Sequence, residues 1–501
     1  MAGIGDLFDD ARLIAANIAD YASDIVEPTL RLGVTGLARS GKTVFITALV
    51  NALLSGGRLP LFEPYASGRL ARAHLEPQPD DAVPRFAYEE HLAALTSGND
   101  RHWPESTRRI AELRIVIRYE SASLFGRTLS GGQLTLDIVD YPGEWLLDLP
   151  LLGLDYAEWS ARTVAMSREG PRAELAAPWH ALLAGLDAAA PAIESDAREA
   201  AARFTAYLAA ARDERHALSA LPPGRFMMPG DLEGSPALTF APLDIQPGQR
   251  AVSGSLHAMM ARRYDAYREK IVKPFFRDHF ARLDRQIVLV DALQALNAGP
   301  AAIADLETAL AEILVAFRPG ANSLLSRIFA RRIDRILFAA TKADHVASAD
   351  HDRLQAILRR LTSRAIERAE FAGAEVEAAA LAAVRATREG TVVKDNESLP
   401  CVIGIPEQGQ RLGRKAFNGE KEIAIFPGDL PENPESLFQQ VESLSEAVES
   451  NSHPAEPDID GDYRYVRFRP PLVTPAQGGV YHLPHIRLDR ALQFLIGDRL
   501  R

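Results

Sequence analysis

The feature that most constrains the fold is a glycine-rich turn between a short apolar segment and a helical one. Residues 36–43 read Gly-Leu-Ala-Arg-Ser-Gly-Lys-Thr, and they join the apolar run 30–35 to the helical stretch 42–54. Glycines at both ends of such a turn let backbone N–H groups face phosphate oxygens, while the following helix directs its positive end at the same place. The pattern predicts a strand, a phosphate-binding turn and a helix, which together begin an α/β fold.

The side chains of this turn have separate expected roles. We expect Lys42 to add positive charge near the outer phosphates and the Thr43 hydroxyl to bind Mg²⁺. The alternative is a tight glycine turn without a ligand, which the flanking strand and helix disfavour. The phosphate cradle is expected to consist of Gly36, Leu37, Ala38, Arg39, Ser40, Gly41, Lys42, Thr43 and Val44.

A second polar cluster follows the strand predicted at 134–139. Asp140 at the end of this strand can hold Mg²⁺, usually through water, and Gly143 can offer its N–H to a terminal phosphate. An isolated Asp-x-x-Gly is usually only a turn. Because residues 113–119 also read as a strand and a short polar loop follows them, we expect an antiparallel pair here. Asp137 should lie on the opposite strand face and is interpreted as structural.

A third cluster, Thr341-Lys-Ala-Asp344, ends the strand predicted at 333–340, and His345 follows it. The Asp344 carboxylate can accept hydrogen bonds from the N1–H and 2-amino groups of guanine, a pair of donors that adenine lacks. The aliphatic stem of Lys342 can lie over the base plane. The alternative is that Asp344 caps the next helix.

Length and composition exclude several classes of protein. A chain of 501 residues exceeds what one core usually organises. Its net charge of −11 argues against bulk nucleic-acid binding, which needs clustered Lys and Arg. No apolar run approaches the roughly 18 residues of a membrane span, and the N-terminus lacks the pattern of a secretory signal. Because Cys401 is the single cysteine, no internal disulfide can form, and we expect a cytoplasmic protein.

The three clusters, in this order, resemble those of translation-factor-class P-loop GTPases. Further stretches are similar to the YcjX-like family of bacterial stress-associated GTPases. These stretches are residues 36–47, Trp103-Pro-Glu-Ser-Thr107, Asp140-Tyr-Pro-Gly-Glu-Trp145 and residues 483–497. The resemblance implies an α/β, three-layer P-loop GTPase fold with a mostly parallel sheet, interrupted by a large helical insertion. It also implies GTP/GDP and Mg²⁺ as cofactors and a role in stress responses.

The resemblance implies roles for further residues. Thr107 would be a switch threonine that closes onto Mg²⁺; Ser106 competes for this role, and a loop hydroxyl bonded to its own backbone is the structural alternative. The base-contacting loop should fall near Ala382, Ala383 and Val384, although no polar residue marks it.

Two departures bear on catalysis. Glu144 stands where small GTPases commonly carry a water-orienting Gln; as a catalytic residue its acidic side chain could accept a proton or orient water, yet its charge would also repel the γ-phosphate. Arg39 occupies a position that carries an arginine finger in dynamin-like GTPases; the alternative is a solvated surface arginine.

The spacing of the clusters indicates where the extra length lies. Lys42 and Asp140 are 98 residues apart and Asp140 and Asp344 are 204 apart, whereas compact GTPases need roughly 40 and 60. We therefore expect the helical block to be a nucleotide-responsive surface for a protein partner, such as a membrane-associated stress protein. The expected division is an N-terminal helix at 1–29, a first GTPase segment at 30–149, a helical insertion at 150–284, a second GTPase segment at 285–400, and a C-terminal extension at 401–501 with an acidic linker and a closing helix.

Taken together, the sequence predicts a GTP-binding protein that hydrolyses GTP and acts as a conformational switch. Two alternatives stay open at this point. One is a binding module that GTP stabilises without appreciable turnover, which Glu144 favours and Arg39 opposes. The other is a P-loop ATPase in which the cluster ending at Asp344 is coincidental.

Overall fold

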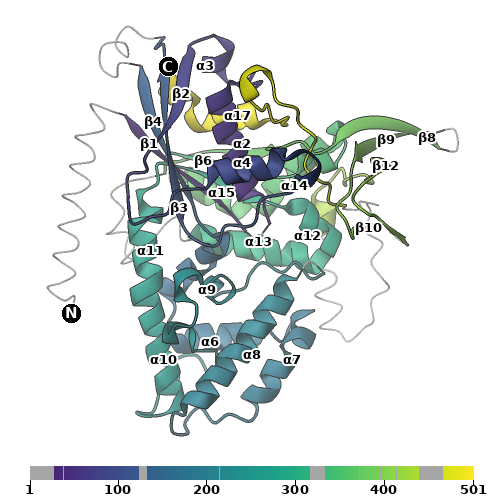
Figure 1. Ribbon diagram of the computed structural model, residues 1–501. Helices are drawn as coiled ribbons and strands as arrows, with labels where there is room; N and C mark the ends of the chain where they lie inside the picture. The colour runs from purple at the N-terminus through teal and green to yellow at the C-terminus, as the bar shows by residue number, and fades with distance from the viewer. Residues whose placement is uncertain are drawn as a thin grey trace.

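The computed structural model describes residues 28–37, 39–122, 132–213, 215–315, 333–371, 373–394, 397–412, 414–438 and 466–501. The helix predicted at 4–27 and the acidic linker at 441–462 lie outside the described residues. Within these ranges the chain forms a mixed α/β structure around one large sheet (Figure 1). None of the helices described is both long and apolar enough to cross a membrane.

The central sheet has seven strands. Their spatial order is β2 (Leu70–Glu76), β3 (Ala111–Tyr119), β4 (Gln133–Asp140), β1 (Thr29–Gly36), β5 (Arg285–Val290), β6 (Arg335–Ala340) and β7 (Glu375–Ala380). The strands from β4 to β7 in this order are mutually parallel, and β3 is antiparallel to β4, as predicted for that pair. Asp137 accepts two hydrogen bonds of 2.7 Å from Arg114 on β3, in agreement with its structural interpretation.

Helices cover both faces of this sheet. Ile287 and Leu289 of β5 belong to one apolar cluster, and Val288 and Val290 belong to the other, because successive side chains of a strand point to opposite faces. The first cluster is covered by α2 (Lys42–Ser55), α4 (Tyr88–Thr96) and α17 (Leu488–Ile496). The second is covered by α12 (Ala292–Ala298), α13 (Pro300–Val315), α14 (His351–Leu361) and α15 (Ser363–Phe371). A sheet buried on both faces explains why its parallel strands read as continuous apolar runs.

A helical block lies between the 3₁₀ segment η2 (Gly143–Gly153) and β5. It comprises α6 (Tyr156–Met166), α7 (Arg172–Leu183), α8 (Glu194–Arg212), α9 (Gly224–Met227), α10 (Leu256–Tyr267) and α11 (Lys273–Asp278), and Figure 1 shows it below the sheet. Aromatic side chains fill its interior: Trp159 stacks on Tyr264 at 4.9 Å between ring centres, and Trp179 stacks on Tyr207. Helices α10 and α11 are joined by a π-helical turn at Arg268–Val272.

Several elements differ from the sequence expectations. Residues 60–105, for which no strand or helix was predicted, contain α3 (Glu63–Ala66), β2 and α4. A small antiparallel sheet of β8 (Arg388–Lys394), β9 (Glu397–Gly404) and β12 (Ile423–Ile425), with the hairpin β10 (Arg411–Leu412) and β11 (Lys415–Ala416), was not anticipated. Strand β9 runs through residue 400, where a boundary was expected. Short edge strands carry weak apolar patterns, because their pairing partners rather than their own residues decide that they form.

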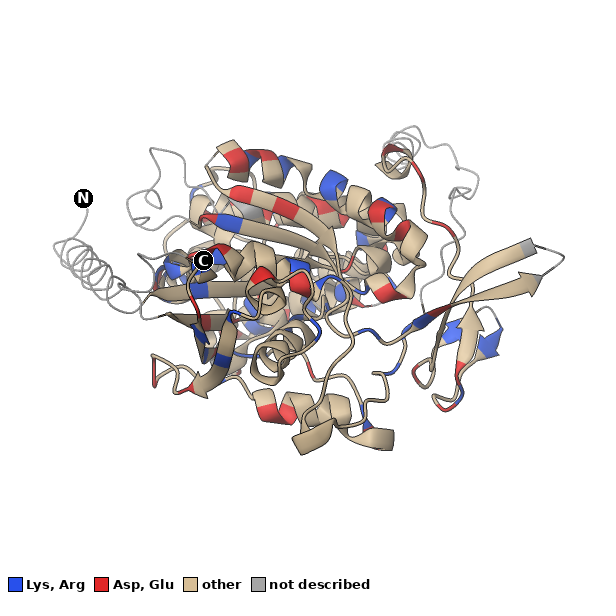
Figure 2. Ribbon diagram, turned by 90° about the horizontal axis from the view of Figure 1, so that it is seen from above, with Lys and Arg blue, Asp and Glu red and all other residues tan. Residues whose placement is uncertain are grey.

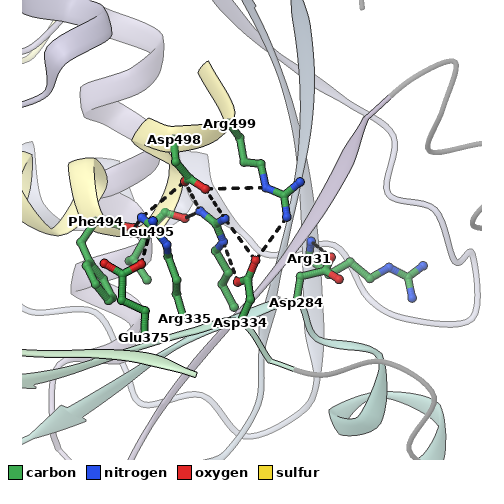
Figure 3. Close-up of polar contacts among 10 residues, drawn as sticks. Arg31, Asp284, Asp334, Arg335, Glu375, Phe494, Leu495, Asp498 and Arg499 are labelled. Carbon is green, nitrogen blue, oxygen red and sulfur yellow. Dashed lines mark hydrogen bonds and ion pairs between the residues drawn. The ribbon is translucent and has the colours of Figure 1, made fainter. Parts of the chain in front are cut away.

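The C-terminal helix α17 is bound to the sheet by a network of charged side chains (Figure 3). Arg285, 1% exposed at the start of β5, donates to Asp334, to the Leu495 carbonyl at 2.6 Å and to Asp498 at 2.5 and 2.7 Å. Arg335 donates to the Phe494 carbonyl at 2.7 Å. Residues 494–498 thereby belong to the same structural unit as the central sheet. Elsewhere, acidic and basic residues are interspersed along the elements seen in Figure 2.

Replacing Arg285 with Ala should lower the free energy of unfolding by about 3 kcal/mol, because it removes the buried guanidinium that Asp334, Asp498 and the Leu495 carbonyl share. The measurement is urea unfolding followed by circular dichroism. Arg388→Ala is the matched control, since it removes an exposed ion pair with Glu422 and should change stability by less than about 0.5 kcal/mol. Equal effects of the two substitutions would contradict the role given to the network.

Candidate functional site

The turn between β1 and α2 has the backbone that its sequence predicts. Arg39 and Gly41 have positive φ angles of 61° and 86°, so the chain curls back on itself, and Ala38 lies outside the described residues. A Cβ atom on Gly36 would lie 2.3 Å from the Leu289 carbonyl oxygen, so this position also requires glycine for space. The Lys42 ammonium donates to the Gly36 carbonyl at 2.7 Å across the turn.

Lys42 is a buried cation, 7% exposed. Burial lowers the pKa of Lys42, while the negative charges of Glu144 and Asp140 raise it and the positive charge of Arg212 lowers it further. The ammonium therefore lies among two carboxylates, from the end of β4 and the segment that follows it, and a guanidinium from the end of α8.

The three residues predicted to bind a metal ion come together. The Thr107 hydroxyl donates to Asp140 Oδ2 at 2.6 Å, and the Thr43 and Thr107 hydroxyl oxygens are 3.3 Å apart. Thr43 also contacts the Glu105 carbonyl at 3.3 Å. Ser106, the competing candidate, lines the adjacent cavity but makes no such bond among the described contacts. The structure thus favours Thr107 over Ser106 as the partner of Thr43 and Asp140.

The Asp140 carboxylate has hydrogen-bonding capacity that the described residues do not use. Its Oδ1 atom is buried and has no hydrogen-bond partner among the described residues. Burial raises the pKa of Asp140 to about 7, against the lowering effects of the Thr107 hydrogen bond and the Lys42 charge. An unsatisfied buried acceptor is costly and indicates that something else binds there.

The donor set fits Mg²⁺. It offers one carboxylate and two hydroxyl oxygens, and Mg²⁺ prefers hard oxygen ligands and is usually bound by few protein groups together with substrate phosphates. Among the residues described, no cluster of three or more His, Cys, Asp or Glu could hold a metal ion by itself. Thr43, Thr107 and Asp140 are therefore suited to a metal that arrives with phosphate rather than to a permanent metal centre.

The cluster after β6 is held in place by buried polar contacts. Lys342 has a φ of 61°, and its ammonium contacts Asp291 Oδ2 at 2.5 Å. Asp344 is 4% exposed; its carboxylate accepts from the Ala386 N–H at 2.7 Å and contacts the His345 ring nitrogen at 3.1 Å. Burial would raise the pKa of Asp344, but the charge of His345 and these hydrogen bonds outweigh it and lower the pKa. Asp344 is thus kept ionised inside the protein.

The loop after β7 is held by the C-terminal motif. Ala382 and Ile486 exchange backbone hydrogen bonds of 3.1 and 2.8 Å, and the Arg385 N–H donates to the Pro484 carbonyl at 2.7 Å. The Leu381 carbonyl accepts from the Ala343 N–H at 3.1 Å, which joins this loop to the cluster after β6. The sequence drew attention to residues 483–497 but not to this role.

The phosphate turn, Thr107, the cluster after β6 and the loop after β7 line one cavity of about 490 Å³, and Asp140 is hydrogen-bonded to Thr107 in its wall. The phosphate turn forms one end, and Thr341, Lys342, Asp344 and His345 with the loop 381–384 form the other. Sequence reasoning did not assign the remaining wall residues: Gln294, Asn297, Glu407, Gln410, Arg411, Arg467 and Phe468. The signal in the sequence that could have pointed to this wall is Trp103, which begins the stretch Trp103–Thr107 that resembles the YcjX-like family. Its indole N–H donates to the Phe468 carbonyl at 2.7 Å, while the Phe468 ring packs edge-on against His345.

The segment after β4 touches the phosphate turn directly. A Cβ atom on Gly143 would lie only 1.8 Å from the Gly36 carbonyl oxygen. Glu144, 3% exposed, forms an ion pair with Arg212 at the end of α8. Arg39 lines the cavity described above and a second one on the other side of the turn.

The sheet and the cavity together define a class. A mostly parallel sheet with a phosphate-type turn after its first strand, and polar clusters after β4 and β6, is the arrangement of P-loop GTPase-like α/β proteins.

Comparison with known proteins makes the assignment specific. The model of the YcjX-like family, DUF463, matches residues 30–500, so the chain belongs to this family. It is 40% identical over 487 residues to the "Ras-like GTPase YcjX" of Escherichia coli K12, covering 95% of this chain and 97% of that protein. It is 36% identical over 496 residues to the protein of the same description from Shewanella oneidensis, covering 94% of each.

The contact between Gly143 and Gly36 can be tested by adding one methyl group. Gly143→Ala should lower the free energy of unfolding by about 1–3 kcal/mol, because the new Cβ overlaps the phosphate turn. Gly153→Ala is the control in the same segment, since nothing lies within 4 Å of its Cβ position. Thermal unfolding of the two variants checks this, and a Gly143→Ala variant as stable as the control would refute the close approach.

Proposed function

We propose that this protein binds GTP and GDP with Mg²⁺ and hydrolyses GTP to GDP and phosphate. The observation that carries the proposal is the chain of oxygens from Thr43 through Thr107 to Asp140, next to the buried Lys42. Lys42, Thr43 and Thr107 line the cavity that also contains Asp344. The description of the relatives as Ras-like GTPases supports it.

In the proposed complex, the phosphates lie in the turn from Gly36 to Val44. Backbone N–H groups and the positive end of α2 face the phosphate oxygens, and Lys42 neutralises the outer phosphates. Thr43, Thr107 and Asp140 would hold Mg²⁺, which neutralises charge that develops between the β- and γ-phosphates. Hydrolysis forms a bond from water to the γ-phosphorus and breaks the bond to the bridging oxygen, which leaves with GDP.

The base is proposed to lie at the other end of the cavity. There the Asp344 carboxylate would accept from the guanine N1–H and 2-amino groups. The Lys342 stem, held by its ion pair with Asp291, would lie along the base. The backbone of Ala382, Ala383 and Val384 would contact the base edge and His345 would support Asp344. We do not favour an ATPase, because adenine lacks the adjacent N1–H and 2-amino donors that an ionised, buried Asp344 would accept from.

The output is proposed to be conformational and transmitted to the helical block. The segment that contacts the phosphate turn is bonded to this block at several points: the Trp145 indole N–H donates to the Met228 carbonyl at 3.0 Å, and Asp148 accepts 2.7 Å hydrogen bonds from the Gly224 N–H and the Tyr267 hydroxyl. Movement near the γ-phosphate would therefore move the block. We extend the proposal to a protein partner bound there, such as a membrane-associated stress protein, and to a stress-response role in the cytoplasm.

A second candidate function is a GTP-stabilised binding module with negligible turnover. It is favoured by Glu144, because a buried acidic residue already paired with Arg212 replaces the neutral water-orienting Gln. Single-turnover measurements separate the two: release of phosphate from pre-bound GTP at a rate dependent on Lys42 supports the GTPase, whereas tight binding with no release supports the module. Arg39→Ala tests the cis arginine finger, whose loss should slow that release.

Asp344→Asn should change the preferred base from guanine to xanthine. An amide can donate to the 2-carbonyl of xanthine but cannot accept two guanine donors, so we expect the affinity for GDP to fall by about 100-fold or more and that for XDP to rise. Competition of GDP, XDP and ADP against a labelled nucleotide measures this. Unchanged GDP affinity in the variant, or equal binding of ADP and GDP by the wild-type chain, would overturn the guanine assignment.

Thr107→Ala should weaken the Mg²⁺-dependent preference for GTP over GDP by about tenfold, because it removes one oxygen from the site. Ser106→Ala is the neighbouring control and should leave this preference unchanged. The measurement is the affinity for a non-hydrolysable GTP analogue and for GDP at several Mg²⁺ concentrations. A larger effect at Ser106 than at Thr107 would reverse the assignment.

A further inference from the structure

The identity of Glu144 presents an electrostatic problem. It directly follows Gly143, which touches the phosphate turn, and its carboxylate is buried and close enough to Lys42 to raise the pKa of that lysine. A γ-phosphate bound next to Lys42 would meet this carboxylate in a region with little water to screen the repulsion. Either Glu144 moves away when GTP binds, or its charge is balanced.

Movement of Glu144 is restricted by the helical block. Its backbone packs against Gly224 so closely that a Cβ atom on Gly224 would lie 1.8 Å from the Glu144 carbonyl oxygen. The next turn is fixed as well, because Asp148 accepts from the Gly224 N–H and the Tyr267 hydroxyl. The backbone that carries the carboxylate is therefore held beside the phosphate turn by contacts with the helical block.

The structure supplies the balancing charge from the same block. Arg212, the last residue of α8, forms an ion pair with Glu144, and its charge also acts on Lys42. The backbone around Arg212 is anchored: the Leu218 N–H donates to the Ala211 carbonyl at 3.1 Å, and Asp305 on α13 accepts from the Ala220 N–H at 2.9 Å. Arg212 is thus supported by packing and hydrogen bonds independent of any nucleotide.

We propose that Arg212 is a positioning residue for the γ-phosphate site, which neutralises Glu144 and so allows a triphosphate to bind beside it. The inference rests on the proposed function, because it concerns discrimination between GTP and GDP at that site. A paired glutamate and arginine together carry no net charge, like the neutral glutamine of small GTPases. Because Arg212 ends α8, the net charge of the site also depends on the position of this helix. The helical block then controls the affinity for GTP.

A double-substitution cycle separates this role from others. With Glu144 present, Arg212→Ala leaves an unpaired carboxylate that repels the γ-phosphate, so the ratio of GTP-analogue to GDP affinity should fall by about tenfold or more. In a Glu144→Gln background there is no charge to balance, and Arg212→Ala should change the ratio by less than about threefold. A direct bond from Arg212 to the phosphate would instead lower the ratio equally in both backgrounds, which would overturn the proposal.

The experiment measures equilibrium binding of GDP and a non-hydrolysable GTP analogue, with Mg²⁺, to the full chain and its variants. Arg263→Ala is the matched control, since it removes an ion pair between α10 and Glu194 at the far end of α8 and should leave the ratio unchanged. Arg212→Lys keeps the charge and should retain a ratio within about threefold of the wild type, which guards against loss of folding in the alanine variant.

The outcomes also separate this inference from the proposed function. If the wild-type chain does not bind guanine nucleotides, the proposed function fails. If it binds them but Arg212→Ala leaves the ratio unchanged, or Arg212→Lys lowers it as much as Arg212→Ala, only the role of Arg212 fails.

Discussion

The structure depends on a buried cation placed among charges from distant parts of the chain. The Lys42 ammonium is fixed by the Gly36 carbonyl and lies near Asp140, Glu144 and Arg212. An isolated buried ammonium would be very costly, so each of these charges constrains the others. The phosphate turn, the end of β4 and the helical block are therefore electrostatically linked, and a bound phosphate would alter all three together.

The C-terminal part of the chain completes the same site from the opposite side. Residues 484–486 pair with the loop after β7, and Phe468 joins Trp103 to His345. At the opposite end of the strands, Asp498 is bound by Arg285, at the start of β5. Because residues 484–498 are anchored at both ends of the strands, they belong to the same structural unit as the central sheet, which agrees with a family match that runs to residue 500.

Local patterns predicted the parts of the site whose geometry is local. The turn at 36–43, the strand that ends at Asp140 and the cluster at Asp344 each combine an apolar strand with a polar end. The structure places the turn and the Asp344 cluster in one cavity and bonds Asp140 to Thr107 in its wall. The place of Thr107 beside Thr43 and Asp140 followed only from family resemblance. Long-range partners such as Arg212 and Phe468 carried no signal, because a lone arginine in a helix or a lone phenylalanine in a loop is compatible with many positions.

The most direct test of the proposed site is a crystal structure of the full chain with Mg²⁺ and a non-hydrolysable GTP analogue. We expect the phosphates in the turn from Gly36 to Val44, the metal ion beside Thr43, Thr107 and Asp140, and the guanine N1–H and 2-amino groups on Asp344. A nucleotide bound elsewhere, or one whose base does not contact Asp344, would contradict the assignment of the cavity as a guanine-nucleotide site.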